Sequence, residues 1–203
     1  MTAPLPVAIA GVVLAAGLSR RMGEAKLLLP LEGRPVVRHT VEHLLDARLD
    51  PVIVVTGTED RAIRAALRDL NVVFAVNPQP EAGQAGSVKV GIATVPADAP
   101  AALVALGDQP FVPGEVIAAL LEARAHTGRP IVAPHYRDGR GNPVLFSREV
   151  FAELTEISGD QGARSILERD PSRVTLVDVD RPMPQDLDTP EDYARLRRAG
   201  NPV

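Results

Sequence analysis

The order of short apolar runs and helical patterns constrains the fold of this chain more than any other feature of its sequence. Residues 7–16 and 51–56 are short, rich in Val and Ile, and typical of buried strands, whereas residues 34–49 carry apolar side chains at helical spacing. The alternation continues with a helix expected at 59–70 and a strand at 72–76. Strands that alternate with helices predict a parallel sheet between layers of helices.

The second half of the chain repeats this pattern with variation. We expect strands at 101–106, 130–134, 142–146 and 174–179, and helices at 85–95, 113–125, 147–154, 162–168 and 189–198. No long linker, low-complexity tract or internal repeat divides the sequence. We therefore predict a single α/β domain over residues 1–203, Rossmann-like and three-layered, with a mostly parallel sheet.

Composition excludes several classes of protein. The chain has 203 residues, a formal net charge of −4 and no cysteine, so thiolate nucleophiles and cysteine-ligated zinc are absent. An acidic chain with 3% aromatic residues lacks both the positive field and the rings that nucleic-acid binding needs. No apolar run approaches the roughly 18 residues of a membrane span, and residues 1–11 lack the basic start of a signal peptide. We expect a cytoplasmic protein that contacts neither nucleic acid nor membrane.

The loop after the first expected strand carries groups suited to phosphate binding. Parallel sheets of this class bind ligands beyond the carboxyl ends of their strands, and the loop LAAGLSRRMGEAK lies at such an end. Its small residues let a ligand approach the backbone, and Ser19, Arg21 and Lys26 supply donors and positive charge for triphosphate oxygens. The loop matches neither the Walker A pattern nor the dinucleotide GxGxxG pattern. A surface loop with two chance arginines is the alternative interpretation.

Two acidic segments are candidates for holding a divalent metal ion. Asp108 follows the strand expected at 101–106, and Mg²⁺ favours one or two carboxylates together with substrate phosphates. Residues 186–192, with the sequence DLDTPED, provide further carboxylates. A turn-forming role for Asp108 and a helix-start role for 186–192 are the alternatives.

Five segments together resemble a known family. They are, in this order, LAAGLSRRMGEAKLLLPLEGRPVV, GDQP, GRGNPVLF, GDQGAR and DLDTPEDY. The set resembles the molybdenum cofactor nucleotidyltransferases over about Val12 to Leu196, and most closely the cytidylyltransferases, because guanylyl members carry LAGG in place of LAAG. The resemblance implies the nucleotide-diphospho-sugar transferase type of fold and transfer of CMP from CTP to the molybdopterin cofactor, with Mg²⁺ as cofactor. It also implies transient docking to a molybdenum hydroxylase.

The resemblance assigns roles to individual residues. The implied nucleotide contacts are Leu14, Ala15, Ala16, Gly17, Ser19, Arg21, Lys26 and Ser87. Asp108 and Asp188 correspond to metal ligands, and Arg21, Lys26 and Asp108 to the catalytic groups. The implied pterin side consists of Gly141, Asn142, Pro143, Gly159, Asp160, Gly162 and Arg164.

Two other functions stay open on the sequence alone. One is a nucleotidyltransferase of the same fold that uses GTP or that transfers to a sugar or polyol phosphate. The other is a non-catalytic cofactor carrier. The presence of Arg21, Lys26, Asp108 and Asp188 favours an enzyme over a carrier.

Overall fold

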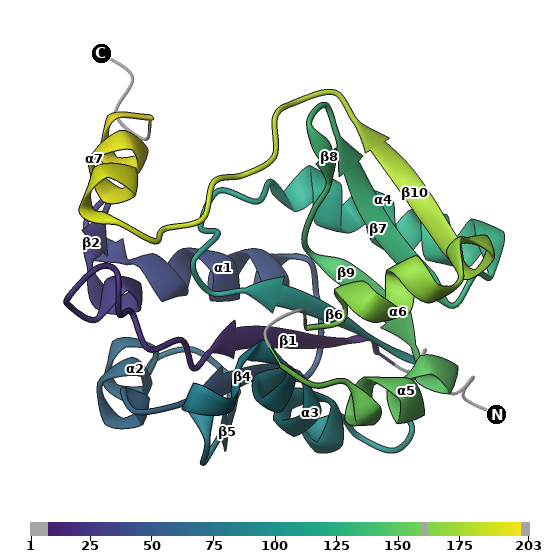
Figure 1. The fold of residues 1–203 in the computed structure, drawn as a ribbon, viewed down its shortest axis with the longest axis horizontal. Helices are drawn as coiled ribbons and strands as arrows, with labels where there is room; N and C mark the ends of the chain where they lie inside the picture. The colour runs from purple at the N-terminus through teal and green to yellow at the C-terminus, as the bar shows by residue number, and fades with distance from the viewer. Residues whose placement is uncertain (1–7, 160–161, 200–203) are drawn as a thin grey trace, which may run out of the picture.

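The computed structural model describes residues 8–159 and 162–199, and one sheet runs through the middle of them (Figure 1). Its strands are β1 (Ala10–Ala15), β4 (Val52–Thr56), β5 (Val73–Val76), β6 (Ala101–Leu106), β7 (Ile131–Tyr136), β8 (Gly139–Arg140), β9 (Val144–Ser147) and β10 (Val174–Val179). The order across the sheet is β10-β7-β9-β6-β1-β4-β5, and β8 pairs with β7. In the part of the chain that the structure describes, no helix has the length and apolar character to span a membrane.

Strand directions bring the predicted loops to one edge of the sheet. β1 pairs in parallel with β4 and β6, and β4 pairs in parallel with β5. β10 is parallel to β7, whereas β9 is antiparallel to both β6 and β7. The expected mostly parallel sheet is thus confirmed. Because the carboxyl ends of β1, β4 and β6 meet at the same edge, the loops that follow them share that edge.

Helices cover both faces of the sheet (Figure 1). One face packs against α1 (Val36–Asp46), α2 (Asp60–Ala66) and α4 (Gly114–Thr127), and the other packs against α3 (Gln84–Thr94), α5 (Phe151–Glu156) and α6 (Arg164–Arg169). Successive side chains of β1 point to opposite faces of the sheet and so divide the core into two apolar clusters. Val13 and Ala15 lie in the first apolar cluster, on the face of α1, and Val12 and Leu14 lie in the second, on the face of α3. The predicted three-layer architecture follows from this division.

A glycine lets α3 approach the centre of the sheet. A Cβ atom on Gly91 would lie 2.4 Å from Cγ1 of Val12 and 3.1 Å from Cγ2 of Val55. Real Cβ atoms do not come that close to their neighbours, so only glycine permits this packing distance. Gly91 lies in the second half of α3, and the close approach holds this helix against β1 and β4.

Several element boundaries differ from the sequence-based expectation. The helix expected at 34–49 begins at Val36, because Arg34–Pro35 forms strand β3 against β2 (Pro30–Leu31) and Pro35 has an extended ψ of 141°. The helix expected at 59–70 ends at Ala66, and the strand expected at 130–134 continues to Tyr136. The last helix, α7 (Pro190–Ala199), packs on the first apolar cluster through Leu196.

Candidate functional site

Backbone hydrogen bonds hold three distant segments together at the carboxyl edge of the sheet. The amide of Gly107 donates to the carbonyl of Leu14 at 3.0 Å, so the turn after β6 lies directly beside the start of the first loop. The amide of Leu187 donates to the carbonyl of Asp108 at 3.0 Å, and the Leu187 side chain is fully buried in the core. The first loop, the Gly-Asp turn and the acidic segment before α7 are therefore fixed relative to one another.

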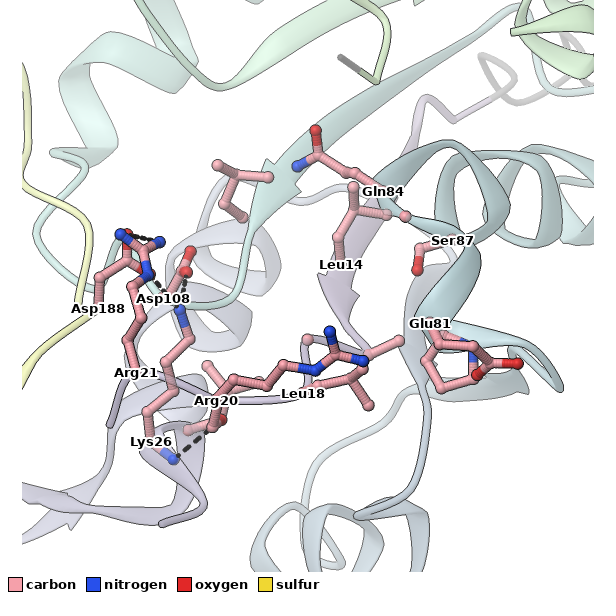
Figure 2. Close-up of a pocket in the computed structure, with 17 residues that line it drawn as sticks. Leu14, Leu18, Arg20, Arg21, Lys26, Glu81, Gln84, Ser87, Asp108 and Asp188 are labelled. Carbon is pink, nitrogen blue, oxygen red and sulfur yellow. Dashed lines mark hydrogen bonds and ion pairs between the residues drawn. The ribbon is translucent and has the colours of Figure 1, made fainter. Parts of the chain in front are cut away.

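Four charged side chains from these segments form one cluster (Figure 2). The Nζ atom of Lys26 donates to Oδ2 of Asp108 at 2.5 Å and to Oδ1 of Asp188 at 2.9 Å. The Nη2 atom of Arg21 donates to Oδ2 of Asp188 at 2.6 Å. Both oxygens of Asp188 are thus paired, and the predicted catalytic and metal-binding residues lie together.

The acidic segment also supplies the start of a helix, but it uses other residues for that purpose. The carboxylate of Asp192 accepts from the amides of Asp188 and Thr189 at 3.1 and 2.8 Å. The hydroxyl of Thr189 in turn accepts from the amide of Asp192 at 3.2 Å, which completes a capping box at the start of α7. Capping leaves the Asp188 side chain free to pair with Lys26 and Arg21.

Lys26 and Arg21 differ in their exposure to solvent. The Lys26 side chain is 9% exposed, whereas that of Arg21 is 71% exposed. Burial acts to lower the pKa of the Lys26 amine, but the attraction and hydrogen bonds of Asp108 and Asp188 outweigh burial and raise that pKa. Lys26 is therefore a positively charged group held inside the protein, while Arg21 covers the same cluster from the solvent side.

A third carboxylate lies next to the cluster. Burial and the negative charges of Asp108 and Asp188 raise the pKa of Asp186. The Nε2 atom of Gln109 donates to Oδ1 of Asp186 at 2.6 Å, while Oε1 of Gln109 is buried without a hydrogen-bond partner. The site thus concentrates negative charge that Lys26 and Arg21 balance only in part.

The donor chemistry of the cluster fits a hard divalent cation. Oδ2 of Asp108 and Oδ1 of Asp188 converge on one point, the Nζ atom of Lys26, at 2.5 and 2.9 Å. Carboxylate oxygens are the protein ligands that Mg²⁺ prefers. Across residues 8–159 and 162–199, no group of three or more His, Cys, Asp or Glu side chains is arranged to hold a metal ion. Substrate phosphates and water would therefore have to complete the coordination, as is usual for Mg²⁺.

A cavity of about 400 Å³ lies over the cluster and extends to the amino end of α3 (Figure 2). Most of the predicted nucleotide contacts line it: Leu14, Ala16, Gly17, Ser19, Arg21, Lys26 and Ser87, together with Asp108 and Asp188. Ala15 does not line this cavity. Its side chain is buried in the apolar cluster on the opposite face, because successive side chains of a strand point to opposite sides of the sheet.

Ser87 is held in place at the far end of this cavity from the charged cluster. Its hydroxyl accepts a hydrogen bond from Nδ2 of Asn77 at 3.1 Å, and both residues are buried. The Oδ1 atom of Asn77 accepts from the amide of Gln79 at 3.0 Å, which orients the amide group. The Ser87 hydroxyl keeps its own hydrogen for a ligand in the cavity.

A second, larger cavity of about 900 Å³ lies on the side of β9 and α6. Gly141, Asn142 and Arg164 from the predicted pterin side line it. Pro143 is buried and does not line it. The other predicted residues lie beside the amino end of α3: the carbonyl of Gly159 accepts from the amide of Ala85 at 3.1 Å, and a Cβ on Gly162 would meet the Gln84 side chain. Asp160 falls outside the described residues.

Several residues that line the cavities were not among the predicted contacts. Arg20 points from the first loop toward the Glu81 side of the smaller cavity (Figure 2). Gln84 lines both cavities, and Gln109 and Asp186 line the larger one. Gln109 is part of the GDQP motif and Asp186 alternates with Asp188, so the sequence contained a signal for these two. The resemblance gave a role to Arg21 but none to Arg20, the residue before it.

Comparison with protein families and known sequences supports a nucleotide-dependent activity. Residues 11–174 match the family model of the MobA-like NTP transferase domain. The purine catabolism protein PucB of Bacillus subtilis is 31% identical over 203 residues, which cover 93% of this chain and 96% of that protein. The nicotine blue oxidoreductase of Paenarthrobacter nicotinovorans is 32% identical over 200 residues, with the same coverage of 93% and 96%.

Comparison with solved structures gives the same fold. The crystal structure of Rv0371c from Mycobacterium tuberculosis H37Rv superposes with a TM-score of 0.87 at 36% identity, covering 97% of this chain and 98% of that one. A structure of Rv0371c in complex with manganese superposes with a TM-score of 0.83 at 33% identity, covering 95% and 99%. A structural relative of this chain therefore binds a divalent metal ion.

Proposed function

This chain belongs to the family of MobA-like NTP transferase domains, and from that premise we propose that it transfers CMP from CTP to the molybdopterin cofactor. The observation that carries the proposal is the charged cluster of Lys26, Arg21, Asp108 and Asp188 at one end of the smaller cavity. It combines cations for phosphate oxygens with carboxylates for a metal ion, which is the set of groups that nucleotidyl transfer needs.

The two cavities adjoin, as a reaction between two bound substrates requires. Leu14, Gln84 and Leu106 line both of them. The cluster lines the smaller cavity, and Asp186 brings the acidic segment into the wall of the larger one. We assign the smaller cavity to the nucleotide and the larger one to the acceptor, so that the acceptor phosphate meets the α-phosphate near the cluster.

The residues of the cluster supply positioning and charge. In the proposed reaction an acceptor phosphate oxygen attacks the α-phosphorus, the bond from that phosphorus to the bridging oxygen breaks, and pyrophosphate leaves. Lys26 and Arg21 donate hydrogen bonds to phosphate oxygens and offset the charge that builds on the leaving group. A divalent cation held by Asp108 and Asp188 would neutralise charge on the phosphates and align them. No side chain becomes covalently bound to the nucleotide.

The choice of CTP rests on the resemblance to cytidylyl members and on the wall of the smaller cavity. Ala16 lines this cavity, is 4% exposed, and carries a methyl group that glycine would lack. A pyrimidine needs less space than a purine, so this methyl group contributes to a preference for CTP that we expect to be about tenfold or more for the cavity as a whole.

The larger cavity has the mixed lining that a pterin phosphate acceptor would require. Apolar walls come from Val104, Phe146 and Leu167, and basic groups from Arg140 and Arg164. Flat heterocycles pack on apolar side chains, and arginine binds phosphate through paired hydrogen bonds.

Pyrophosphate release tests the proposal directly. The purified full chain is incubated with Mg²⁺, with molybdopterin, and with CTP, GTP or UTP in turn. We expect release with CTP at least about tenfold more efficient in kcat/KM than with GTP. Equal use of CTP and GTP would contradict the cytidylyl assignment, and release only with a sugar or polyol phosphate would contradict the acceptor. Absence of release with every nucleotide and acceptor would contradict nucleotidyl transfer itself.

A further inference from the structure

The ammonium group of Lys26 lies at the point where the two proposed metal ligands converge. Its Nζ atom is 2.5 Å from Oδ2 of Asp108 and 2.9 Å from Oδ1 of Asp188. The side chain is 9% exposed, and its backbone amide donates to Oγ of Ser19 at 3.3 Å. Lys26 is therefore a buried part of the site, and both its side chain and its backbone amide are hydrogen-bonded there.

A divalent cation and this ammonium group would need the same place. Mg²⁺ binds carboxylate oxygens at about 2.0–2.1 Å, and the oxygens that converge on Nζ are those that such an ion would use. Both are positively charged, so joint occupation of one site is unfavourable. For the metal ion to bind both carboxylates, the ammonium group must move.

Lysine is suited to such a movement. Its ammonium is a compact charge on a flexible four-carbon stem, unlike the planar fork of arginine. Of the 22 lysine and arginine residues in the chain, only Lys26 and Lys89 are lysine. Ser19 and Gly17 line the same cavity as Lys26, so phosphate oxygens bound there would give the ammonium group a new partner.

We propose that Lys26 is a resident counter-ion that occupies the metal position in the nucleotide-free protein and transfers to the triphosphate when nucleotide binds. The proposal rests on the proposed function, because it assumes that the cavity takes a metal ion together with a nucleoside triphosphate. It predicts that free metal ion binds weakly on its own and that the lysine makes metal and nucleotide binding cooperative. Lys26 would thus determine the order in which nucleotide and metal ion bind, in addition to stabilising negative charge on the phosphates.

Binding of Mn²⁺ to the nucleotide-free chain tests this, with free Mn²⁺ measured by electron paramagnetic resonance. We expect Lys26→Met to bind Mn²⁺ about tenfold more tightly than the wild type, although it is catalytically impaired. Arg21→Met is the matched control, because it removes an equal charge from Asp188 at a position that is 71% exposed. Its effect should be below about threefold. An equal gain in both variants, or no gain in Lys26→Met, would overturn the proposal.

A second measurement tests the transfer to nucleotide. In the wild type, a non-hydrolysable CTP analogue should tighten Mn²⁺ binding by about tenfold or more, and in Lys26→Met this coupling should fall severalfold. Unchanged coupling would overturn the proposal. Failure of the analogue to bind either form would instead count against the nucleotide assignment, while the Mn²⁺ comparison without nucleotide would still decide the role of Lys26. Circular dichroism checks folding, and Lys26→Gln replaces Lys26→Met if the latter does not fold.

Discussion

The two cavities are built in different ways, although they share one edge of the sheet. The smaller cavity is formed by loops after parallel strands, and its charged groups already pair with one another at 2.5 to 2.9 Å. The larger one borders the antiparallel strand β9 and the helix α6, where the Arg164 side chain is 73% exposed and pairs with Glu168. In the smaller cavity, charged side chains from three segments are thus joined to one another, whereas Arg164 of the larger cavity pairs with Glu168 of its own helix. Substitutions should affect turnover in the first and acceptor binding in the second.

The largest effect is expected from Asp108→Ala. The substitution removes a proposed metal ligand and leaves the Lys26 ammonium with one carboxylate in place of two. We expect kcat for pyrophosphate release to fall by about 100-fold or more, because charge stabilisation at the reacting phosphates is lost. Asp108 lies in a turn rather than in the core, so the far-ultraviolet circular dichroism should be unchanged. Wild-type turnover in folded protein at saturating Mg²⁺ would remove Asp108 from the proposed mechanism.

The next largest effect is expected from Lys26→Arg. This chain uses arginine at nearly every other basic position, yet the buried space between Asp108 and Asp188 holds a compact ammonium group. A guanidinium is larger and planar, so kcat/KM should drop by about tenfold or more while net charge stays the same. Lys89→Arg is the control, and its kinetic constants should match those of the wild type. Unchanged constants in Lys26→Arg would show that any positive charge suffices there.

The fold was more predictable from the sequence than the site was. Apolar runs such as 101–106 define strands through their own composition, so the strands and the parallel sheet followed from local patterns. Local patterns did not predict which of Asp186, Asp188 and Asp192 caps the helix and which pairs with Lys26. All three are acidic, and any of them can cap a helix. Only the folded chain shows that Asp192 caps α7 and that Asp188 turns toward Lys26.

The same limit explains the residues that were missed. Gln109 belongs to the GDQP motif, and Gln84 begins a segment, residues 84–89, that resembles the family's loop over the base and ribose and in which Ser87 was the predicted contact. Neither glutamine carries a charge, and the place of each in the cavity walls depends on how α3 and the turn after β6 pack. Pairing between Lys26 and Asp108 spans 82 residues of sequence, a separation that no local pattern records.

The larger cavity should respond through acceptor binding. Arg164→Ala removes a basic group from its wall, and we expect the KM for molybdopterin to rise by about threefold to tenfold with kcat and the KM for CTP unchanged. Because this arginine is exposed, the effect should shrink as ionic strength increases. Arg169→Ala is the matched control: Arg169 lies on the same helix but does not line the cavity. A fall in kcat with no change in the acceptor KM would break the distinction between the two cavities.

The smallest effect is expected at Ala16, and it tests whether the wall of the smaller cavity selects between CTP and GTP. Ala16 lines this cavity and packs against Gly57, where a Cβ would lie 3.2 Å from that of Ala16. Ala16→Gly removes one methyl group from the wall, so we expect the preference for CTP over GTP in kcat/KM to fall by about threefold without being abolished. Ala15→Gly removes the same group one residue earlier, but on the face of the sheet that points away from the cavity. It should lower the thermal midpoint, because glycine weakens a strand, and leave the CTP to GTP ratio unchanged. Equal ratios in the two variants would mean that base selection lies elsewhere in the cavity.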